Sequence, residues 1–259
     1  MPDTLKALVR RVVPSPILQW RSDRIAARKH ARIAALPLAG KFDHIYQAGL
    51  WGRAVDGAMS SGDGSRDAAV VAPYVAAVSA VLSKLPPGRT LVDIGAGDFS
   101  VGVQLLPQVA SYVACDISSV IVEQNRSRYA GLPNVEFRVL DATEDALPVA
   151  DVVTIRQVLQ HLSNEQIARI LPKLSAYAAI IVTESVPQED DYVANVDHRP
   201  GFSTRVIESN SAVDLAQPPF DLPHVAARVL CEPQTSVERV AGRIRTTLYV
   251  TEKGRALGL

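Results

Sequence analysis

The sequence predicts an α/β protein built on an open, mostly parallel β-sheet that is flanked by helices. Between residues 89 and 187, short apolar runs alternate with longer segments of helical character, and such runs are typical of strands buried on both faces. Most of these runs end in an acidic or polar residue. Because open parallel sheets bind ligands at the carboxyl ends of their strands, the pattern predicts a small-molecule site at that edge.

The first strand leads into the most informative segment, RTLVDIGAGDFS at residues 89–100, in which Asp93 closes the apolar run. Gly95 and Gly97 allow a tight turn that a Cβ atom would obstruct. A helix over about residues 101–109 would then place its N-terminus and bare backbone N–H groups beside a ligand. An acidic side chain at the end of a buried strand is costly unless something pairs with it. Asp93 is therefore expected to face that ligand.

The spacing of the glycines disfavours two common nucleotide sites. A dinucleotide-binding turn reads G-x-G-x-x-G, and Ser100 stands at the position of the third glycine. A phosphate-binding P-loop needs G-x-x-x-x-G-K-[ST], and no lysine follows here. The D-x-G-x-G pattern at residues 93–97 therefore indicates a cofactor without a bound pyrophosphate.

Four further strands are expected within the segments 112–118, 135–143, 150–163 (running into a loop and helix) and 178–187, and the strand in the last segment is expected to end at Glu184. Asp116 follows the glycines by about twenty residues, where a carboxylate can accept both hydroxyls of a ribose. Asp141 ends the third strand. Alternatively, Asp116 and Asp141 cap turns or helices, as Asp does in any protein. Asp98 either caps the helix that follows it or touches the cofactor.

These motifs together resemble the class I S-adenosylmethionine (SAM)-dependent methyltransferases, whose motif I is the D-x-G-x-G turn. The resemblance implies a Rossmann-like fold with a seven-stranded, mostly parallel sheet in the order 3-2-1-4-5-7-6. Its last two strands would be antiparallel, at residues 227–233 and 242–252, with a turn near residues 234–242. The implied cofactor is SAM, converted to S-adenosylhomocysteine. Asp93 would hold its methionine end, Asp116 its ribose, and Asp141 would face its adenine.

An N-terminal lid is expected from FDHIYQAGLWG at residues 42–52 and SSGDGS at residues 60–65, followed by a helix over about residues 67–85. With QHLSN at 160–164 and PPFDLP at 218–223, these segments resemble bacterial methyltransferases linked to small-molecule and saccharide O-methylation. The alternative is that Tyr46 and Trp51 are core aromatics beneath a turn. The residues expected to bind the cofactor are Trp51, Ser61, Gly62, Ser65, Asp93, Gly95, Ala96, Gly97, Asp116, Ile117, Asp141, Ala142, Arg156 and Gln157.

The length of 259 residues favours one sheet domain with additions. The expected division is an N-terminal helical arm and lid (1–85) and a SAM-binding domain (86–259) with a substrate-facing insertion (187–223). Residues 1–41 carry nine Lys or Arg against two Asp, with a helix plausible over 17–35. Such a basic helix can bind an anionic lipid surface or a partner. Alternatively, it packs on its own domain and exposes its basic face to solvent, which is the more common case for charged runs.

The composition excludes several classes of function. The formal net charge is zero, so nothing in the overall balance indicates nucleic acid or membrane. No apolar run reaches the ~18 residues of a membrane span, and no leading apolar segment suggests a cleaved signal. Cys115 and Cys231 lie in strand-like runs and are too few for a zinc site. A cytoplasmic protein is expected, and a homodimer is left open.

Methyl transfer to a hydroxyl needs a positioned general base, most often histidine. Among the five histidines, His161 follows the fourth strand at the carboxyl edge of the sheet and is the expected base, unless it only packs or caps the next helix. Tyr46, Glu184 and His198 are candidates for contact with the acceptor. Glu184 with Asp190 or Asp191 could hold Mg²⁺, but no ligand spacing supports a metal.

The leading functional hypothesis is a SAM-dependent O-methyltransferase that acts on a hydroxyl of a saccharide or polyol, for instance in the assembly of a methylated polysaccharide such as methylmannose chains. A first alternative is N- or C-methylation of a small heteroaromatic metabolite, against which an aromatic content of 5% counts. A second is a regulator that binds SAM without turnover. Nucleic acid is not expected as a substrate.

Overall fold

The computed structural model describes residues 33, 35–237 and 240–259. The chain divides into two units, Met1–Pro37 and Leu38–Leu259, and the second contains the whole sheet. The helix expected over 17–35 and almost all of the basic segment lie outside the described residues. In the described parts of the chain, no helix has both the length and the apolar character that crossing a membrane requires.

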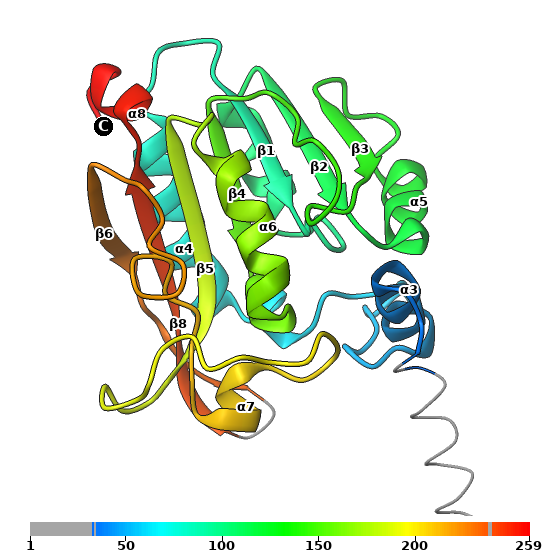
Figure 1. Cartoon of the computed structure of the whole chain (residues 1–259). Coiled ribbons are helices and arrows are strands. Elements are labelled where there is room, and N and C mark those ends of the chain that lie inside the picture. The colour runs from blue at the N-terminus through cyan, green and yellow to red at the C-terminus, as the bar shows by residue number, and fades with distance from the viewer. Residues whose placement is uncertain (1–32, 34, 238–239) are drawn as a thin grey trace, which may run out of the picture. The chain divides into compact units, whose positions relative to one another are not determined.

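One eight-stranded sheet forms the centre of the larger unit, in the order β3-β2-β1-β4-β5-β8-β6, with β7 also paired to β8 (Figure 1). The strands are β1 (Thr90–Ile94), β2 (Ser111–Asp116), β3 (Val135–Val139), β4 (Val152–Arg156), β5 (Ala179–Pro187), β6 (Ala226–Cys231), β7 (Gln234–Val237) and β8 (Val240–Val250). The first five are parallel, and β8 is antiparallel to β5, β6 and β7. The expected fold class and strand order are confirmed, with one additional short strand.

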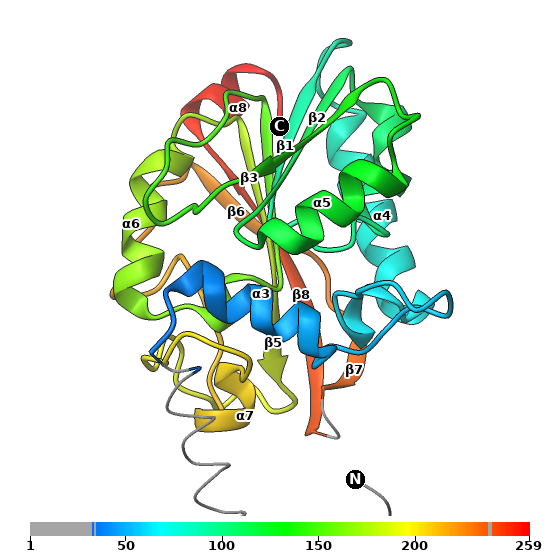
Figure 2. The same ribbon diagram turned by 90° about the vertical axis from the view of Figure 1, so that its right-hand side faces the viewer.

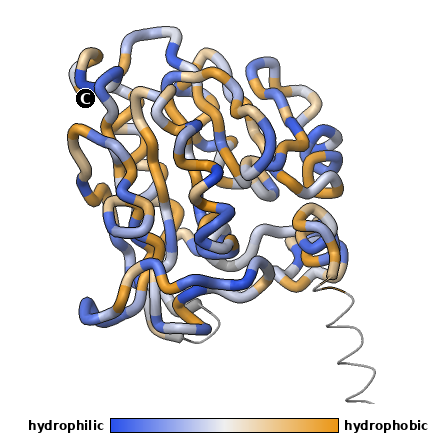
Figure 3. Tube along the Cα trace, viewed as in Figure 1, coloured by the Kyte–Doolittle hydropathy of each residue, from blue (hydrophilic) through white to orange (hydrophobic). Residues whose placement is uncertain are grey.

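Helices cover both faces of this sheet (Figure 2). The α-helices of the larger unit are α3 (Leu38–Ala48), α4 (Ala68–Leu82), α5 (Ser119–Arg128), α6 (Asn164–Leu174), α7 (Arg205–Ser209) and α8 (Glu252–Ala256). Val78, Leu82 and Ile121 of α4 and α5 belong to one hydrophobic cluster, whereas Ile167 and Ile170 of α6 belong to another. The central strands between these clusters are among the most hydrophobic segments of the chain (Figure 3).

Two local expectations are wrong. Residues 101–109 form two 3₁₀ turns, η2 (Gly102–Gln104) and η3 (Leu106–Gln108), instead of an α-helix. Glycine and proline are poor in helix interiors, and a Cβ at Gly102 would lie 2.5 Å from the Phe99 ring, so this close approach requires glycine. The turn expected at residues 234–242 is instead largely β7 and the start of β8, which pair from Gln234 opposite Arg243 to Val237 opposite Val240.

β5 also runs further than expected. It continues past Glu184 to Pro187, because β8 pairs with it residue by residue as far as Pro187 opposite Gly242. Glu184 therefore lies inside a strand and not at its end. After β5, residues 188–225 contain only the short helix α7 as regular structure.

Candidate active site

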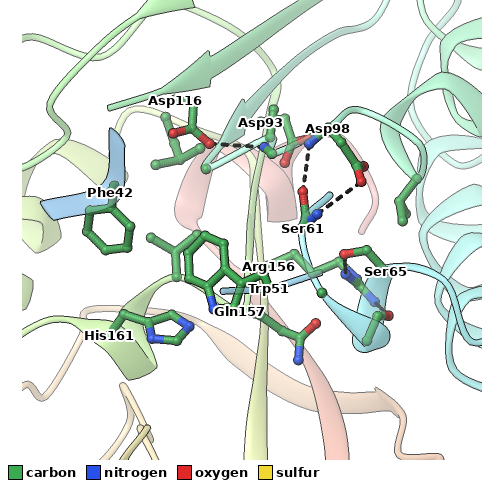
Figure 4. A pocket seen from close by; sticks show the side chains of 18 of the residues that line it. Phe42, Trp51, Ser61, Ser65, Asp93, Asp98, Asp116, Arg156, Gln157 and His161 are labelled. Atoms are coloured by element: carbon green, nitrogen blue, oxygen red, sulfur yellow. Dashed lines mark hydrogen bonds between the residues drawn. The ribbon is translucent and has the colours of Figure 1, made fainter. Parts of the chain in front are cut away.

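A cavity of about 670 Å³ opens at the carboxyl ends of β1, β2 and β4. Its wall is completed by α3, which lies across this edge of the sheet beside α5 (Figure 2), and by the loop at residues 60–67. Every residue expected to bind the cofactor lines this cavity. Figure 4 shows the acidic side chains of the strand ends on one side and Phe42, Trp51 and His161 on the other.

Asp93 is a buried carboxylate that accepts hydrogen bonds from side chains of the neighbouring strands. Its two oxygens accept hydrogen bonds from Thr154 Oγ1 at 2.7 Å and from Tyr112 Oη at 2.9 Å. Burial raises the pKa of Asp93 to about 6, although the two hydrogen bonds oppose this effect. The cost of burying the acid is thus offset in part by hydroxyl donors from β2 and β4.

The glycine turn brings three segments of the chain into close contact. Gly95 and Gly97 have φ values of 72° and 57°, a region that favours glycine. A Cβ at Gly95 would lie 2.2 Å from Val158 Cγ2, and one at Gly97 would lie 2.1 Å from Ser61 Oγ. Both glycines are therefore required by packing within the protein.

Asp98 joins this turn to the loop at residues 60–65 (Figure 4). Ser61 N donates to Asp98 Oδ2 at 3.0 Å, and Asp98 N donates to Ser61 Oγ at 2.6 Å. The other carboxylate oxygen of Asp98 accepts from the N and Oγ of Ser100. Asp98 thus caps the segment after the turn and also fixes the position of the loop.

Asp116 and Asp141 line the cavity and also cap turns, so the capping interpretation is confirmed and their contact with the cofactor stays a prediction. Asp116 accepts from Gly97 N at 3.0 Å and from Ser118 N at 2.9 Å, and burial raises its pKa to about 6. Asp141 Oδ1 accepts from Thr143 N at 2.8 Å and from Thr143 Oγ1 at 2.6 Å. Ile117 and Ala142 lie beside them in the wall.

Arg156, at the end of β4, connects the sheet to the loop at residues 60–65. Its guanidinium donates to Gly64 O at 2.6 Å and to Ser65 Oγ at 3.1 Å, and lies 5.1 Å from the centre of the Tyr74 ring. Its buried Nε has no hydrogen-bond partner among the described residues. Gln157 follows with a φ of 55° and packs against Gly64, where a Cβ would lie 2.4 Å from Gln157 Oε1.

Aromatic side chains gather at one end of the cavity, around Trp51. The centre of its ring is 5.0 Å from that of Tyr46, 5.9 Å from Phe42, 5.4 Å from His161 and 6.5 Å from Phe202. Tyr46 and Phe42 are buried, whereas Trp51 is half-buried and lines the cavity. Although only 5% of the residues are aromatic, several of them line this cavity, so the low aromatic content is no argument against an aromatic acceptor.

His161 is the last residue of the 3₁₀ turn η4 (Leu159–His161) and lines the cavity although only 6% exposed. Its Nδ1 lies 3.0 Å from Gly201 O and 3.2 Å from Ser203 O. Carbonyl oxygens only accept, so the imidazole proton belongs on Nδ1 and the lone pair on Nε2. Burial lowers the pKa of His161 to about 4, which keeps the ring neutral at neutral pH.

Glu184 and His198, which were expected to contact the acceptor, do not line the cavity. Glu184 instead accepts from Leu159 N and Gln160 N, and His198 pairs with Glu208 through Nδ1 at 3.0 Å. Their places in the wall are taken by residues that the sequence analysis did not single out, namely Phe42, Gln160, Phe202, Thr204, Thr235 and Ile244. Phe42 opens FDHIYQAGLWG and Gln160 opens QHLSN, so both could have been found, whereas nothing local marks the others.

Comparisons with known proteins identify the central part of the chain. Residues 92–179, from β1 to the first residue of β5, match a family model described as a methyltransferase domain. The chain carries a SAM-dependent methyltransferase domain. No curated protein sequence matches the chain.

Solved structures share the fold of this methyltransferase. Magnesium protoporphyrin IX methyltransferase (ChlM) from Synechocystis PCC 6803 with bound SAM is 18% identical, with a TM-score of 0.51, over 83% of this chain and 99% of that one. The N-terminal domain of EvdMO1 with SAH bound is 16% identical, with a TM-score of 0.50, over 70% of this chain and 81% of that one. At these identities the likeness shows the fold alone.

SAM is the cofactor of this methyltransferase, and the residues of the cavity fit it. The ammonium group and ribose hydroxyls of SAM are hydrogen-bond donors, and the wall offers the carboxylates of Asp93, Asp116 and Asp141 as acceptors. Within the described ranges, no group of three or more His, Cys, Asp or Glu side chains is arranged to hold a metal ion, so the Mg²⁺ considered from the sequence gains no support.

Proposed function

We propose that this methyltransferase transfers a methyl group from SAM to a hydroxyl of a saccharide or polyol, with His161 as general base. The observation that carries the proposal is the state of His161. Two backbone carbonyls hold the proton on Nδ1, so the lone pair lies on Nε2, where the amide nitrogen of Gln160 is 3.4 Å away, a long contact that a bound acceptor hydroxyl would replace. A hydroxyl is a poor nucleophile at neutral pH and needs such a base, whereas many stronger nucleophiles do not.

The cofactor would be held by the acidic residues and the glycine turn. We assign Asp93 to the methionine ammonium, Asp116 to the ribose hydroxyls and Asp141 to the adenine. Ser61, Gly62, Ser65 and Trp51 would cover the methionine end, because Ser61 is fixed to Asp98 and Ser65 to Arg156. Ala96, Ile117, Ala142 and Gln157 complete the wall.

When bound, SAM supplies a methyl group on a sulfonium, which is already an activated electrophile. The protein then has to align the acceptor oxygen for in-line attack and to remove its proton. His161 Nε2 takes that proton as the oxygen–carbon bond forms and the sulfur–carbon bond breaks. The carbonyl oxygens of Gly201 and Ser203 keep their hold on Nδ1–H and stabilise the imidazolium that results. A methyl ether and S-adenosylhomocysteine are the products.

The lining near His161 suits a sugar. Trp51 offers an aromatic surface on which the C–H face of a sugar ring can pack, and the amide of Gln157 lies in the same wall to bond a hydroxyl. A heteroaromatic acceptor is the second candidate, because Phe42, Trp51 and Phe202 could equally stack on a flat ring.

Replacing His161 tests the proposed chemistry. His161→Gln should leave the affinity for SAM near that of the wild type and lower turnover by ~10²–10⁴, the usual contribution of a positioned base. Calorimetry measures the first quantity and a methyl-transfer assay the second. His224→Gln is the matched control, because His224 lies outside the cavity wall and its Nδ1 contacts Leu222 O. Turnover above about a tenth of the wild-type rate would make His161 a packing residue.

The pH profile gives a second signature of the same base. Because burial lowers the pKa of His161 to about 4, the neutral form persists well below the ordinary histidine value of about 6.5. At saturating SAM, the acid limb of the wild-type kcat should therefore lie near pH 4–5, and a limb centred near pH 6.5 would argue against His161.

A turnover screen separates the acceptor classes. Monosaccharides and oligosaccharides, small heterocycles and tRNA are each incubated with the enzyme and SAM. Methylation of a saccharide supports the proposal, and methylation of a heterocycle supports the second candidate. Binding of SAM without any turnover would indicate a regulator.

The cytoplasmic location, the homodimer and the role of residues 1–85 as arm and lid also belong to this proposal. Cys115 and Cys231 are both free thiols, as a reducing compartment would keep them. Light scattering on the purified protein tests the oligomeric state.

A further inference from the structure

The turn η4, which carries His161, lies between two buried residues of opposite charge. Glu184 of β5 is 2% exposed and Arg205 at the start of α7 is 0% exposed. Neither lines the cavity, so neither is placed to touch the cofactor or the acceptor. Each nevertheless bonds the backbone at one end of the turn.

Glu184 binds the N-terminal end of the turn. Its Oε1 accepts from Leu159 N at 2.9 Å, and its Oε2 accepts from Gln160 N at 3.0 Å. The first N–H groups of a helical turn have no partner within the turn and favour a nearby anion. The carboxylate thus supplies two acceptors at the place where the turn lacks them.

Arg205 binds the other end. Its Nη2 donates at 2.6 Å to the carbonyl oxygen of Leu162, the residue that ends η4, and its Nη1 donates to Val196 O. The last carbonyl groups of a helical turn favour a cation. The Nε of Arg205 has no hydrogen-bond partner among the described residues, so the side chain is only partly satisfied.

Holding these two charges in the interior is costly. Burial raises the pKa of Glu184, whereas the N–H groups of Leu159 and Gln160 and the charge of Arg205 favour the ionised carboxylate. Burial likewise lowers the pKa of Arg205. Buried charges are weak stabilisers of a fold compared with apolar residues of the same size. A geometric role for the pair accounts better for this cost.

We propose that Glu184 and Arg205 are positioning residues that hold the His161 turn from its two ends and keep the imidazole buried against the carbonyls of Gly201 and Ser203. The effect on turnover rests on the proposed function, in which His161 is the base. The effect on the titration of the His161 ring does not rest on the proposed function, because it can be observed without a methyl acceptor.

NMR titration of the histidine ring tests the positioning directly. In the wild type, His161 should titrate near pH 4, and Glu184→Gln should raise that value by at least about half a unit toward 6.5, because a loosened turn admits water. The amide oxygen of the new glutamine can accept one of the two backbone N–H groups of the turn, but its NH₂ group would face the other N–H and repel it. His161→Gln assigns the resonance, and His198, whose charge reaches His161, is followed in the same spectra.

Glu165→Gln is the matched control, because Glu165 is an exposed glutamate near the start of α6. It should leave the titration of His161 unchanged. A folded Glu184→Gln protein in which His161 titrates as in the wild type would overturn the proposal.

Kinetics provide the second test. Glu184→Gln should lower kcat about 10- to 100-fold while the affinity for SAM stays within about twofold, since the cofactor contacts lie elsewhere. Arg205→Lys keeps the charge and one donor and should lose less activity than Arg205→Met. If His161→Gln lowers turnover but all three of these variants retain wild-type kcat, the positioning role is wrong.

Failure of this proposal can be told from failure of the proposed function. If His161→Gln retains turnover but Glu184→Gln still shifts the ring titration, the base assignment is wrong and the positioning stands. If the variants do not fold, amide exchange in the wild type decides: slow exchange at Leu159 and Gln160 supports the contact with Glu184, and fast exchange at both overturns it.

Discussion

Asp93 and Asp116 are buried acids in a cavity whose cofactor is a cation. Burial raises the pKa of each to about 6, so both are closer to neutrality than a solvated aspartate. Raised pKa values of this kind make the charge of the empty cavity depend on pH in the range from 5 to 7. Binding of a positively charged ligand favours the ionised acids and should reverse part of the shift.

The affinity for SAM should therefore fall as the pH is lowered through about 6. Above this value the carboxylates are ionised and attract the positively charged cofactor, whereas below it the protonated acids lose their charge and part of their acceptor capacity. Calorimetry from pH 5 to 7 measures the effect, and Asp116→Asn should reduce its size. An affinity that does not change over this range would place neither acid against the charged parts of SAM.

Asp116→Ala should weaken SAM binding by about 1–3 kcal/mol, because ribose hydroxyls would lose a charged acceptor. The same change leaves Gly97 N and Ser118 N without their partner, so part of the loss would come from the turn. Asp116→Asn keeps one oxygen for these donors and separates the two contributions. Unchanged affinity in a folded Asp116→Ala protein would remove this residue from the site.

At the scale of elements, α3 is attached to the sheet domain at the edge of the cavity. Asp43 of α3 accepts from Ser118 Oγ at 2.7 Å and from Ser119 Oγ at 3.3 Å, at the beginning of α5. Ser118 lies two residues after Asp116, the last residue of β2, and Phe42 beside Asp43 lines the cavity. The contact of α3 with α5 therefore lies next to the proposed ribose site.

Asp43→Ala should speed the release of SAM by about 2- to 10-fold, the effect of losing hydrogen bonds worth roughly 0.5–1.5 kcal/mol. Stopped-flow fluorescence of Trp51, which lines the cavity, can follow the release. Glu123→Gln on the exposed face of α5 is the control and should release SAM at the wild-type rate. A release rate for Asp43→Ala equal to that of the control would show that this contact does not retain the cofactor.

At the scale of the whole molecule, the described residues of the cavity wall all lie at or after Leu38. Deleting residues 1–30 should therefore leave SAM affinity within about twofold of the full chain, a change of roughly 0.4 kcal/mol. Solubility or oligomeric state should change instead, because this segment carries most of the excess basic charge. Calorimetry and light scattering measure the two effects. Complete loss of SAM binding by a folded truncated protein would show that the arm completes the pocket.

The sequence by itself determined the sheet and the acidic half of the site. Apolar runs predict buried strands, and parallel strands bring their carboxyl ends to one edge, so the positions of Asp93, Asp116 and Asp141 follow from local pattern and elementary geometry. The glycine turn was predictable for the same reason. The backbone angle it needs is a property of the residue itself.

Only the tertiary structure decided the aromatic half of the site and the place of Glu184. Phe42, Trp51 and Phe202 meet only because α3 and the loop before α7 fold over the same edge, and no local pattern encodes contacts between segments so far apart in the chain. Glu184 was expected at the end of a strand, but pairing with β8 extends β5 past it. Its carboxylate consequently lies beneath the turn of His161 and not in the cavity, because long-range pairing sets where a strand ends and what each of its side chains meets.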